Sequence, residues 1–119
     1  MRVLVVDDAP DIRMLAEVAL ATVGGFDVTL VDGGEAALQA VASSPAFDVI
    51  LLDVMMPRLD GPATLARLRA DGCDTPCIFF TARVRPDDVQ AYLDAGAIGT
   101  IEKPFDPMTL AASVAERLS

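Results

Sequence analysis

Short, largely apolar runs alternate along this chain with longer segments in which apolar residues recur every three or four positions. The runs cover residues 3–6, 28–31, 49–52, 77–80 and 100–101. Runs of four or five β-branched and aliphatic residues are typical of strands buried on both faces of a parallel sheet. Each run is followed by a segment of helical periodicity, which predicts five strand-helix units. No linker or low-complexity stretch interrupts them.

Proline, glycine and acidic residues mark the ends of the expected helices. The first helix is expected over 11–23, with Pro10 near its start and Gly24 beyond its end. The later helices are expected to begin near residues 32, 62, 86 and 106, and a glycine follows the third and the fourth. A side-chain oxygen beside a first helical turn can accept an amide hydrogen bond. We therefore expect three aspartates to cap helices: Asp32, Asp60 and Asp106.

Strict alternation of strands and helices predicts an α/β fold. Parallel neighbours in one sheet need a crossover connection, and such crossovers are right-handed. Successive crossovers place helices on both faces of a doubly wound parallel sheet. The 119 residues are enough for one such domain, 1–119, and leave no room for an effector domain.

Four of the five expected strands end in side chains that carry useful chemistry. Asp7 and Asp8 follow the first strand, Asp53 follows the third, Thr81 ends the fourth and Lys103 lies just past the fifth. The carboxyl ends of parallel strands share one edge, where ligands bind in such sheets. Three carboxylates that meet there repel one another unless a cation is present, and oxygen ligands favour Mg²⁺. A carboxylate that attacks phosphorus forms an acyl phosphate, so phosphoryl chemistry fits this edge.

Charge and residue usage narrow the range of partners. The net charge is −9 and the chain has no histidine, which argues against direct binding to nucleic acid. Lys103 is the only lysine beside eight arginines. Cys73 and Cys77 lack further ligands for a zinc site and are expected to be reduced thiols. The N-terminal apolar run is too short, and is followed by too much acid, to be expected to act as a signal peptide. No apolar stretch approaches the ~20 residues that a membrane span needs, so we expect a soluble, cytoplasmic chain.

Taken together, these motifs resemble those of the receiver domain of response regulators in two-component signalling, with the single-domain chemotaxis regulator as the nearest type. The resemblance covers essentially the whole chain. It rests on Val5-Val6-Asp7-Asp8, Leu52-Asp53, Met56-Pro57, Asp60-Gly61, Thr81-Ala82 and Lys103-Pro104-Phe105. It implies a flavodoxin-like fold with strand order 2-1-3-4-5.

The resemblance also implies a role for each site residue. Asp53 corresponds to the phospho-acceptor. Mg²⁺, for which Mn²⁺ can substitute, is implied to be held directly by Asp8, Asp53 and the backbone carbonyl of Met55, and by Asp7 through water. The phosphoryl group is implied to contact the side chains of Thr81 and Lys103 and the backbone amides of Val54 and Ala82. The Lys103-Pro104 bond is implied to be cis.

By the same resemblance, the chain is expected to be a signalling switch and not an enzyme, apart from catalysing its own phosphorylation and dephosphorylation. A sensor histidine kinase or a histidine phosphotransfer protein is expected to supply the phosphoryl group. The signal would then pass to a downstream protein by phosphorylation-dependent binding or by onward transfer. We expect a monomer or a phosphorylation-dependent dimer, with neither membrane insertion nor direct contact with nucleic acid.

The sequence departs from the receiver pattern at one position. Receivers usually carry an aromatic residue three positions before the lysine, and here that position is Thr100. We therefore expect the output change to travel through the loop after Thr81 and the fourth helix. Met55 and Arg83, two positions after Asp53 and Thr81, are expected to tune the lifetime of the acyl phosphate.

Three other functions are alternatives to the receiver. A phosphohydrolase with an aspartyl-phosphate intermediate would need a second acid where Met55 stands. A flavin-binding protein of this architecture would need a hydroxyl-rich phosphate loop, whereas Asp7 and Asp8 would repel a phosphate. A degenerate receiver that only binds proteins stays open as the alternative, although every acidic, threonine and lysine position of the pattern is filled.

Overall fold

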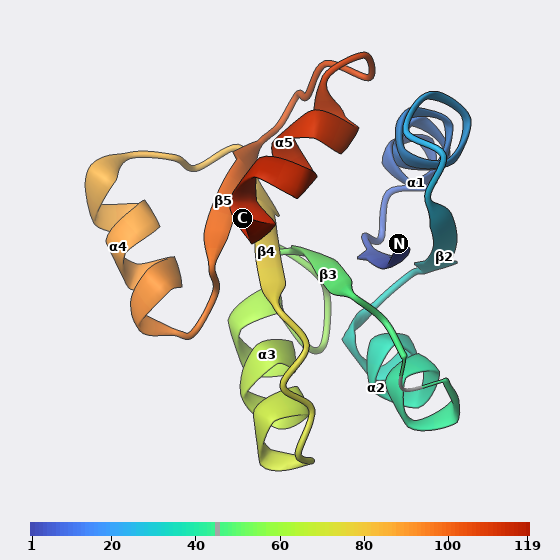
Figure 1. Ribbon diagram of the computed structural model, residues 1–119. Coiled ribbons are helices and arrows are strands. Elements are labelled where there is room, and N and C mark those ends of the chain that lie inside the picture. Colours follow the sequence, from blue (N-terminus) through green and yellow to red (C-terminus); the bar gives the residue numbers. More distant parts are fainter. Residues whose placement is uncertain (45) are drawn as a thin grey trace.

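The computed structural model describes residues 1–44 and 46–119, and a five-stranded parallel sheet forms its centre (Figure 1). The strands are β1 (Arg2–Val6), β2 (Asp27–Val31), β3 (Val49–Asp53), β4 (Cys77–Thr81) and β5 (Gly99–Glu102). Their order in the sheet is β2-β1-β3-β4-β5. This confirms the predicted flavodoxin-like fold, and every apolar run has become a strand.

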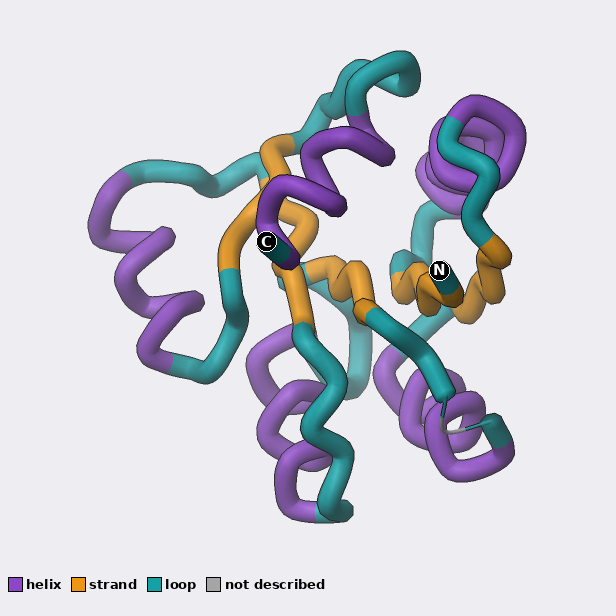
Figure 2. Tube along the Cα trace, in the orientation of Figure 1, coloured by secondary structure: helices purple, strands orange, loops and turns teal. Residues whose placement is uncertain are grey.

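Helices cover both faces of the sheet (Figures 1 and 2). They are α1 (Pro10–Glu17), α2 (Gly34–Ser43), α3 (Gly61–Ala70), α4 (Pro86–Asp94) and α5 (Leu110–Leu118). Alternate strand residues divide the core into two layers. Val5, Leu51 and Phe80 pack with α1 and α5, whereas Leu52 and Phe79 pack with the other three helices. Because both sides of the central strands are covered, those strands are apolar throughout.

The first helix differs from the expectation of one α-helix over 11–23. The α-helix ends at Glu17, and a π-helical segment, η1 (Val18–Val23), continues it. The Gly24 amide donates to the Ala19 carbonyl, five residues back (3.2 Å). A Cβ at Gly24 would lie 2.5 Å from the Ala111 Cβ of α5. The π-helical segment η1 therefore ends where the backbone of Gly24 packs against the Ala111 side chain of α5. The hydrophobic periodicity of the sequence does not reveal such a tertiary contact.

One of the three predicted caps is confirmed and two are wrong. Asp60 Oδ1 accepts the Ala63 amide (2.8 Å) at the start of α3. α2 begins at Gly34 with Gly33 at its N-cap, so Asp32 lies one residue too early to reach the first turn. α5 begins only at Leu110, and Asp106 instead caps a turn before it by accepting the Met108 amide (2.8 Å).

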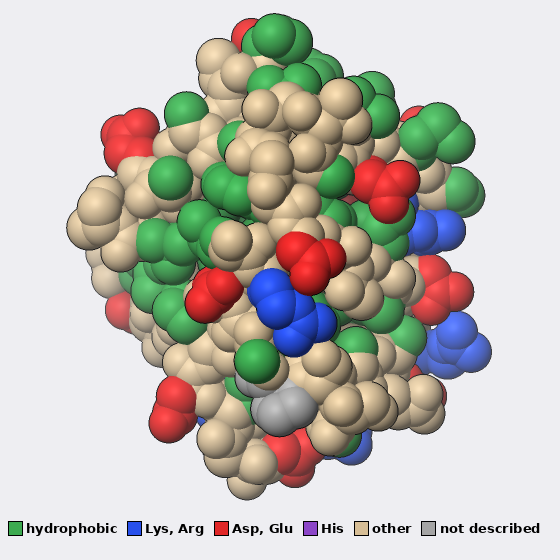
Figure 3. Space-filling view, turned by 45° about the vertical axis from the view of Figure 1, so that its right-hand side comes forward, with side chains coloured by type: hydrophobic (Ala, Val, Ile, Leu, Met, Phe, Trp, Pro, Cys, Tyr) green, Lys and Arg blue, Asp and Glu red, His purple; other side chains and the backbone are tan. Residues whose placement is uncertain are grey.

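The surface is acidic, and its charges are mostly dispersed. On the face seen in Figure 3, acidic side chains are spread over the surface, and some of them lie beside a group of basic side chains near its centre. Only one group of three or more potential metal ligands is found among the described residues, at the carboxyl edge of the sheet. Of the helices in the described part of the chain, none combines the length and the apolarity that crossing a membrane requires.

Candidate functional site

Strand register brings the predicted site residues to one edge of the sheet. Val6 of β1 pairs with Leu52 of β3, so Asp7 and Asp53 occupy neighbouring positions one step further along. Asp53 in turn pairs with Phe80, which precedes Thr81 at the end of β4. The expectation that these strand ends meet is confirmed, because all of the strands run in the same direction.

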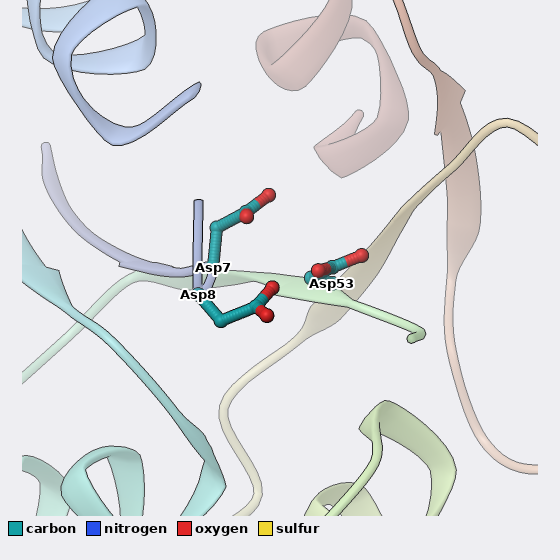
Figure 4. Close-up of side chains that lie close together, drawn as sticks. All are labelled: Asp7, Asp8 and Asp53. Atoms are coloured by element: carbon teal, nitrogen blue, oxygen red, sulfur yellow. The ribbon is translucent and has the colours of Figure 1, made fainter. Parts of the chain in front are cut away.

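The three carboxylates form one cluster (Figure 4). Asp7, Asp8 and Asp53 each offer an oxygen, and these oxygens all lie within 4.8 Å of one another. Their environments differ. Asp7 is fully buried, Asp53 is 6% exposed and Asp8 is exposed. Like charges this close raise the free energy of the ionised cluster, which therefore needs a positive group nearby.

Lys103 provides that positive group. Its Nζ lies 2.5 Å from Asp7 Oδ2 and 3.1 Å from Asp53 Oδ1. Burial alone would lower the pKa of Lys103, but its hydrogen bonds to the two carboxylates and their charges raise it overall. The ammonium is therefore positive at neutral pH and bridges β1 and β3. The Lys103-Pro104 bond is cis, as the resemblance implied.

One lysine does not neutralise three carboxylates, and the pKa of Asp53 is raised. Burial, together with the charge of Asp7, raises the pKa of Asp53 from its ordinary 3.8 to about 6, although Lys103 opposes the change. A further cation beside Asp53 would favour its ionised form. Hard oxygen ligands at this spacing suit Mg²⁺, so the residues present fit such an ion.

Thr81 closes the other side of the site. Its side chain is buried, and its Oγ1 accepts the backbone amide of Arg83 (2.9 Å). A cleft of about 270 Å³ opens here. Its lining is Asp53, Met55, Thr81, Ala82, Arg83 and Lys103. Three of the four residues predicted to contact the phosphoryl group, Thr81, Ala82 and Lys103, therefore line one cleft with Asp53, together with the two that were predicted to tune its chemistry.

The backbone amide of Val54 is arranged differently from the expectation. It donates to the Phe80 carbonyl (3.3 Å) and so extends the pairing of β3 with β4. Val54 itself is buried. Its predicted contact with a phosphoryl group therefore stays a prediction that would require this hydrogen bond to loosen.

Two residues that shape the site were not among the predicted site residues. A Cβ at Gly61 would lie 2.5 Å from the Asp53 carbonyl oxygen, so only glycine lets α3 start this close to β3. Arg13 of α1 donates from Nη1 to the backbone carbonyl of Asp7 (2.8 Å). The Asp60-Gly61 motif pointed to the first residue, whereas nothing marked Arg13 beyond its place five residues after Asp8.

Thr100 lies on β5 beside Phe79, where receivers usually have an aromatic residue. Its carbonyl accepts a hydrogen bond from Arg117 Nε (3.2 Å). The stem of that arginine lies over Gly99, where a Cβ would be 2.9 Å from Arg117 Cδ. An α5 side chain therefore covers the face of β5 on which Gly99 lies, whereas the Thr100 side chain lies on the opposite face, with Phe79.

Comparison with known proteins agrees with this geometry. The family described as "Response regulator receiver domain" matches residues 3–115. The transcriptional regulatory protein PrrA of Mycobacterium tuberculosis is 44% identical over 114 residues, which are 95% of this chain and 48% of that protein. Response regulator MprA of Mycobacterium avium is 43% identical over 105 residues, 88% of this chain and 45% of that protein. The chain thus spans about half the length of the curated relatives it matches.

Solved structures show the same architecture. The chemotaxis protein CheY4 of Vibrio cholerae superposes with a TM-score of 0.89 at 32% identity, covering 97% of this chain and 96% of that one. The receiver domain of the Francisella response regulator 1452 gives a TM-score of 0.87 at 31% identity, covering 98% and 95%.

Proposed function

The chain belongs to the response regulator receiver domain family of two-component signalling, and we propose that Asp53 is its phospho-acceptor. The observation that carries the proposal is the position of Asp53. It is the one carboxylate of the cluster that lines the cleft, and Thr81 and Lys103 line the same cleft. Asp7 is fully buried against Lys103, and Asp8 lies outside the residues that line the cleft.

Magnesium fits this site as a resident cofactor. We propose that Asp8 and Asp53 bind it directly with the Met55 carbonyl, and that Asp7 acts through water. When bound, Mg²⁺ or Mn²⁺ would supply positive charge that favours ionised Asp53 and balances the oxygens of an incoming phosphoryl group. The raised pKa of Asp53 supports this assignment, because burial and the charge of Asp7 disfavour its ionised form and a bound cation would offset both.

The proposed reaction is a phosphoryl transfer to the Asp53 carboxylate. A bond forms between a carboxylate oxygen and phosphorus while the bond from phosphorus to the donor breaks. The donor, an imidazole nitrogen of a phosphohistidine, keeps that electron pair. Lys103 and the Thr81 hydroxyl would contact the phosphoryl oxygens, because both line the cleft into which Asp53 opens. We propose the same contact for the backbone amide of Ala82, a residue that also lines the cleft.

The partners follow from that chemistry. We propose that a sensor histidine kinase or a histidine phosphotransfer protein supplies the phosphoryl group in the cytoplasm. The output would be binding of a downstream protein or onward transfer, with a monomer or a phosphorylation-dependent dimer as the active form. In this scheme the chain catalyses only its own phosphorylation and dephosphorylation.

The test is labelling with acetyl phosphate and Mg²⁺, read by intact mass. Wild type should gain one phosphoryl group and Asp53→Asn should gain none. Asp74→Asn is the matched control, because Asp74 is exposed in the loop before β4 and its carboxylate has no hydrogen bond or salt bridge within the described ranges. Equal labelling of wild type and Asp53→Asn would show that Asp53 is not the phospho-acceptor. Failure to label with either acetyl phosphate or a phosphorylated histidine protein would favour the binding-only receiver.

We also propose that the signal leaves through residues 82–95, the loop after Thr81 and helix α4. The hydrogen bond between Thr81 Oγ1 and the Arg83 amide supports this route, because it ties the hydroxyl at the site to the first turn of that loop. Amide exchange with and without beryllofluoride measures the effect, and protection should change over 82–95. Identical exchange there in the two states would contradict the route.

A further inference from the structure

Asp7 and Asp8 are adjacent in sequence but are held in different ways. Every polar group of Asp7 is engaged. Its amide donates to the Val31 carbonyl (3.2 Å), Oδ1 accepts the Ala9 amide (2.9 Å) and Oδ2 contacts Lys103. The Asp8 carboxylate, by contrast, has no hydrogen bond or salt bridge to the part of the chain that is described. The position of this carboxylate therefore depends on the backbone that carries it.

Arg13 acts on the peptide group that joins these two aspartates. Its Nη1 donates 2.8 Å to the Asp7 carbonyl oxygen, which belongs to the same planar unit as the Asp8 amide. Fixing that carbonyl holds the plane, and with it the position of the Asp8 Cα from which the carboxylate extends. Arg13 itself is half-buried on α1, and its amide donates to the Ala9 carbonyl (3.1 Å). The guanidinium is therefore anchored on a helix that begins two residues after Asp8.

We infer that Arg13 is a positioning residue for the proposed magnesium site, acting on Asp8 through the Asp7 carbonyl. The inference rests on the metal site of the proposed function and adds a residue that does not touch the ion. Partners behind metal ligands typically change metal affinity by about 10- to 100-fold when they are removed. A hydrogen bond from a charged guanidinium to a carbonyl is among the stronger protein hydrogen bonds, and a methionine cannot replace it.

Positioning and simple charge predict opposite results. Arg13 is a cation near three carboxylates, so through charge alone its removal would strengthen Mg²⁺ binding. Through positioning, its removal would weaken binding, because Asp8 would then sample directions away from Asp53. The sign of the change in Mg²⁺ affinity therefore separates the two roles.

The experiment is calorimetric titration of the metal-free protein with MgCl₂. Arg13→Met should bind Mg²⁺ about tenfold more weakly than wild type, and Arg13→Lys, which keeps a donor and the charge, should lose less. Arg67→Met is the matched control, because Arg67 is an exposed arginine of α3 that makes no side-chain hydrogen bond or salt bridge within residues 1–44 and 46–119. The Mg²⁺ affinity of Arg67→Met should equal that of wild type.

Thermal unfolding of the same variants without metal tests a merely structural role. Lower stability of Arg13→Met with unchanged Mg²⁺ affinity would overturn the inference, and so would tighter binding. Absence of Mg²⁺ binding by wild type is a distinct outcome, because it would remove the proposed metal site itself and this inference with it.

Discussion

Replacing Asp53 by asparagine should stabilise the metal-free protein at neutral pH. The raised pKa means that the folded state disfavours ionised Asp53 relative to the unfolded chain, chiefly through burial and the charge of Asp7. A change from 3.8 to about 6 corresponds to about 3 kcal/mol at pH 7. Asparagine has the same shape and keeps an oxygen that can accept from Lys103, so it removes this cost with little change in packing.

The sign of the pH dependence follows from the protons bound in each state. Between about pH 4 and 6 the folded state holds the Asp53 proton more tightly than the unfolded state, so wild-type stability falls as the pH rises through this window. Below it Asp53 is neutral in both states, and the advantage of the variant disappears. Above it the advantage stays constant, because Asp53 is ionised in both states.

Urea unfolding at a series of pH values measures this difference. The chain has no tryptophan, so far-ultraviolet circular dichroism is the signal. The unfolding free energy of Asp53→Asn minus that of wild type should grow from near zero at about pH 4 to about 3 kcal/mol at about pH 7. The same difference for Asp74→Asn should show no such trend. Added Mg²⁺ should stabilise wild type more than Asp53→Asn and so narrow the gap. An advantage that was the same at both pH values would refute the electrostatic reasoning.

Three further substitutions test other parts of the site. Lys103→Met leaves the buried carboxylate of Asp7 without its cation and should cost about 3–5 kcal/mol in urea unfolding, less with Mg²⁺ present. Gly61→Ala places a Cβ against the Asp53 carbonyl oxygen and should lower the unfolding free energy by about 1–3 kcal/mol, with slower acetyl-phosphate labelling; unchanged values in both assays would contradict that contact. Asp60→Ala removes the α3 cap and should cost about 1 kcal/mol without altering Mg²⁺ affinity, whereas weaker Mg²⁺ binding would mean that the cap also orders the site.

The sheet was predictable because burial on both faces leaves a plain mark in the sequence. Runs such as 49–52 and 77–80 can be apolar throughout only where helices cover both sides, and all of these residues are fully buried. Parallel pairing then places the residues after each run at one edge. That Asp7, Asp53 and Thr81 lie at one edge therefore followed from strand direction, whereas their adjacency depends on the strand order, which the family resemblance implied.

The helix starts were less predictable because they depend on tertiary contacts. Asp60 caps α3, yet Asp32 and Asp106, of the same residue type and beside similar periodicity, do not cap α2 and α5. At α2 the helix begins at Gly34, where a Cβ would collide with Thr64 Oγ1 of α3. The start of α2 therefore depends on its close contact with α3 and not on Asp32.

The different roles of Asp7 and Asp8 are the part of the site that could not be predicted from the sequence. In the sequence the two residues are of the same type, and both precede the first helix. In the fold, the ladder to β2 continues through the Asp7 amide, which draws Asp7 inward to Lys103 and leaves Asp8 exposed. A carboxylate already paired with an ammonium gains less from a second cation than an unpaired one does. Asp8, directed by Arg13 and free of other partners among the described residues, is therefore the better placed of the two to bind a metal ion directly.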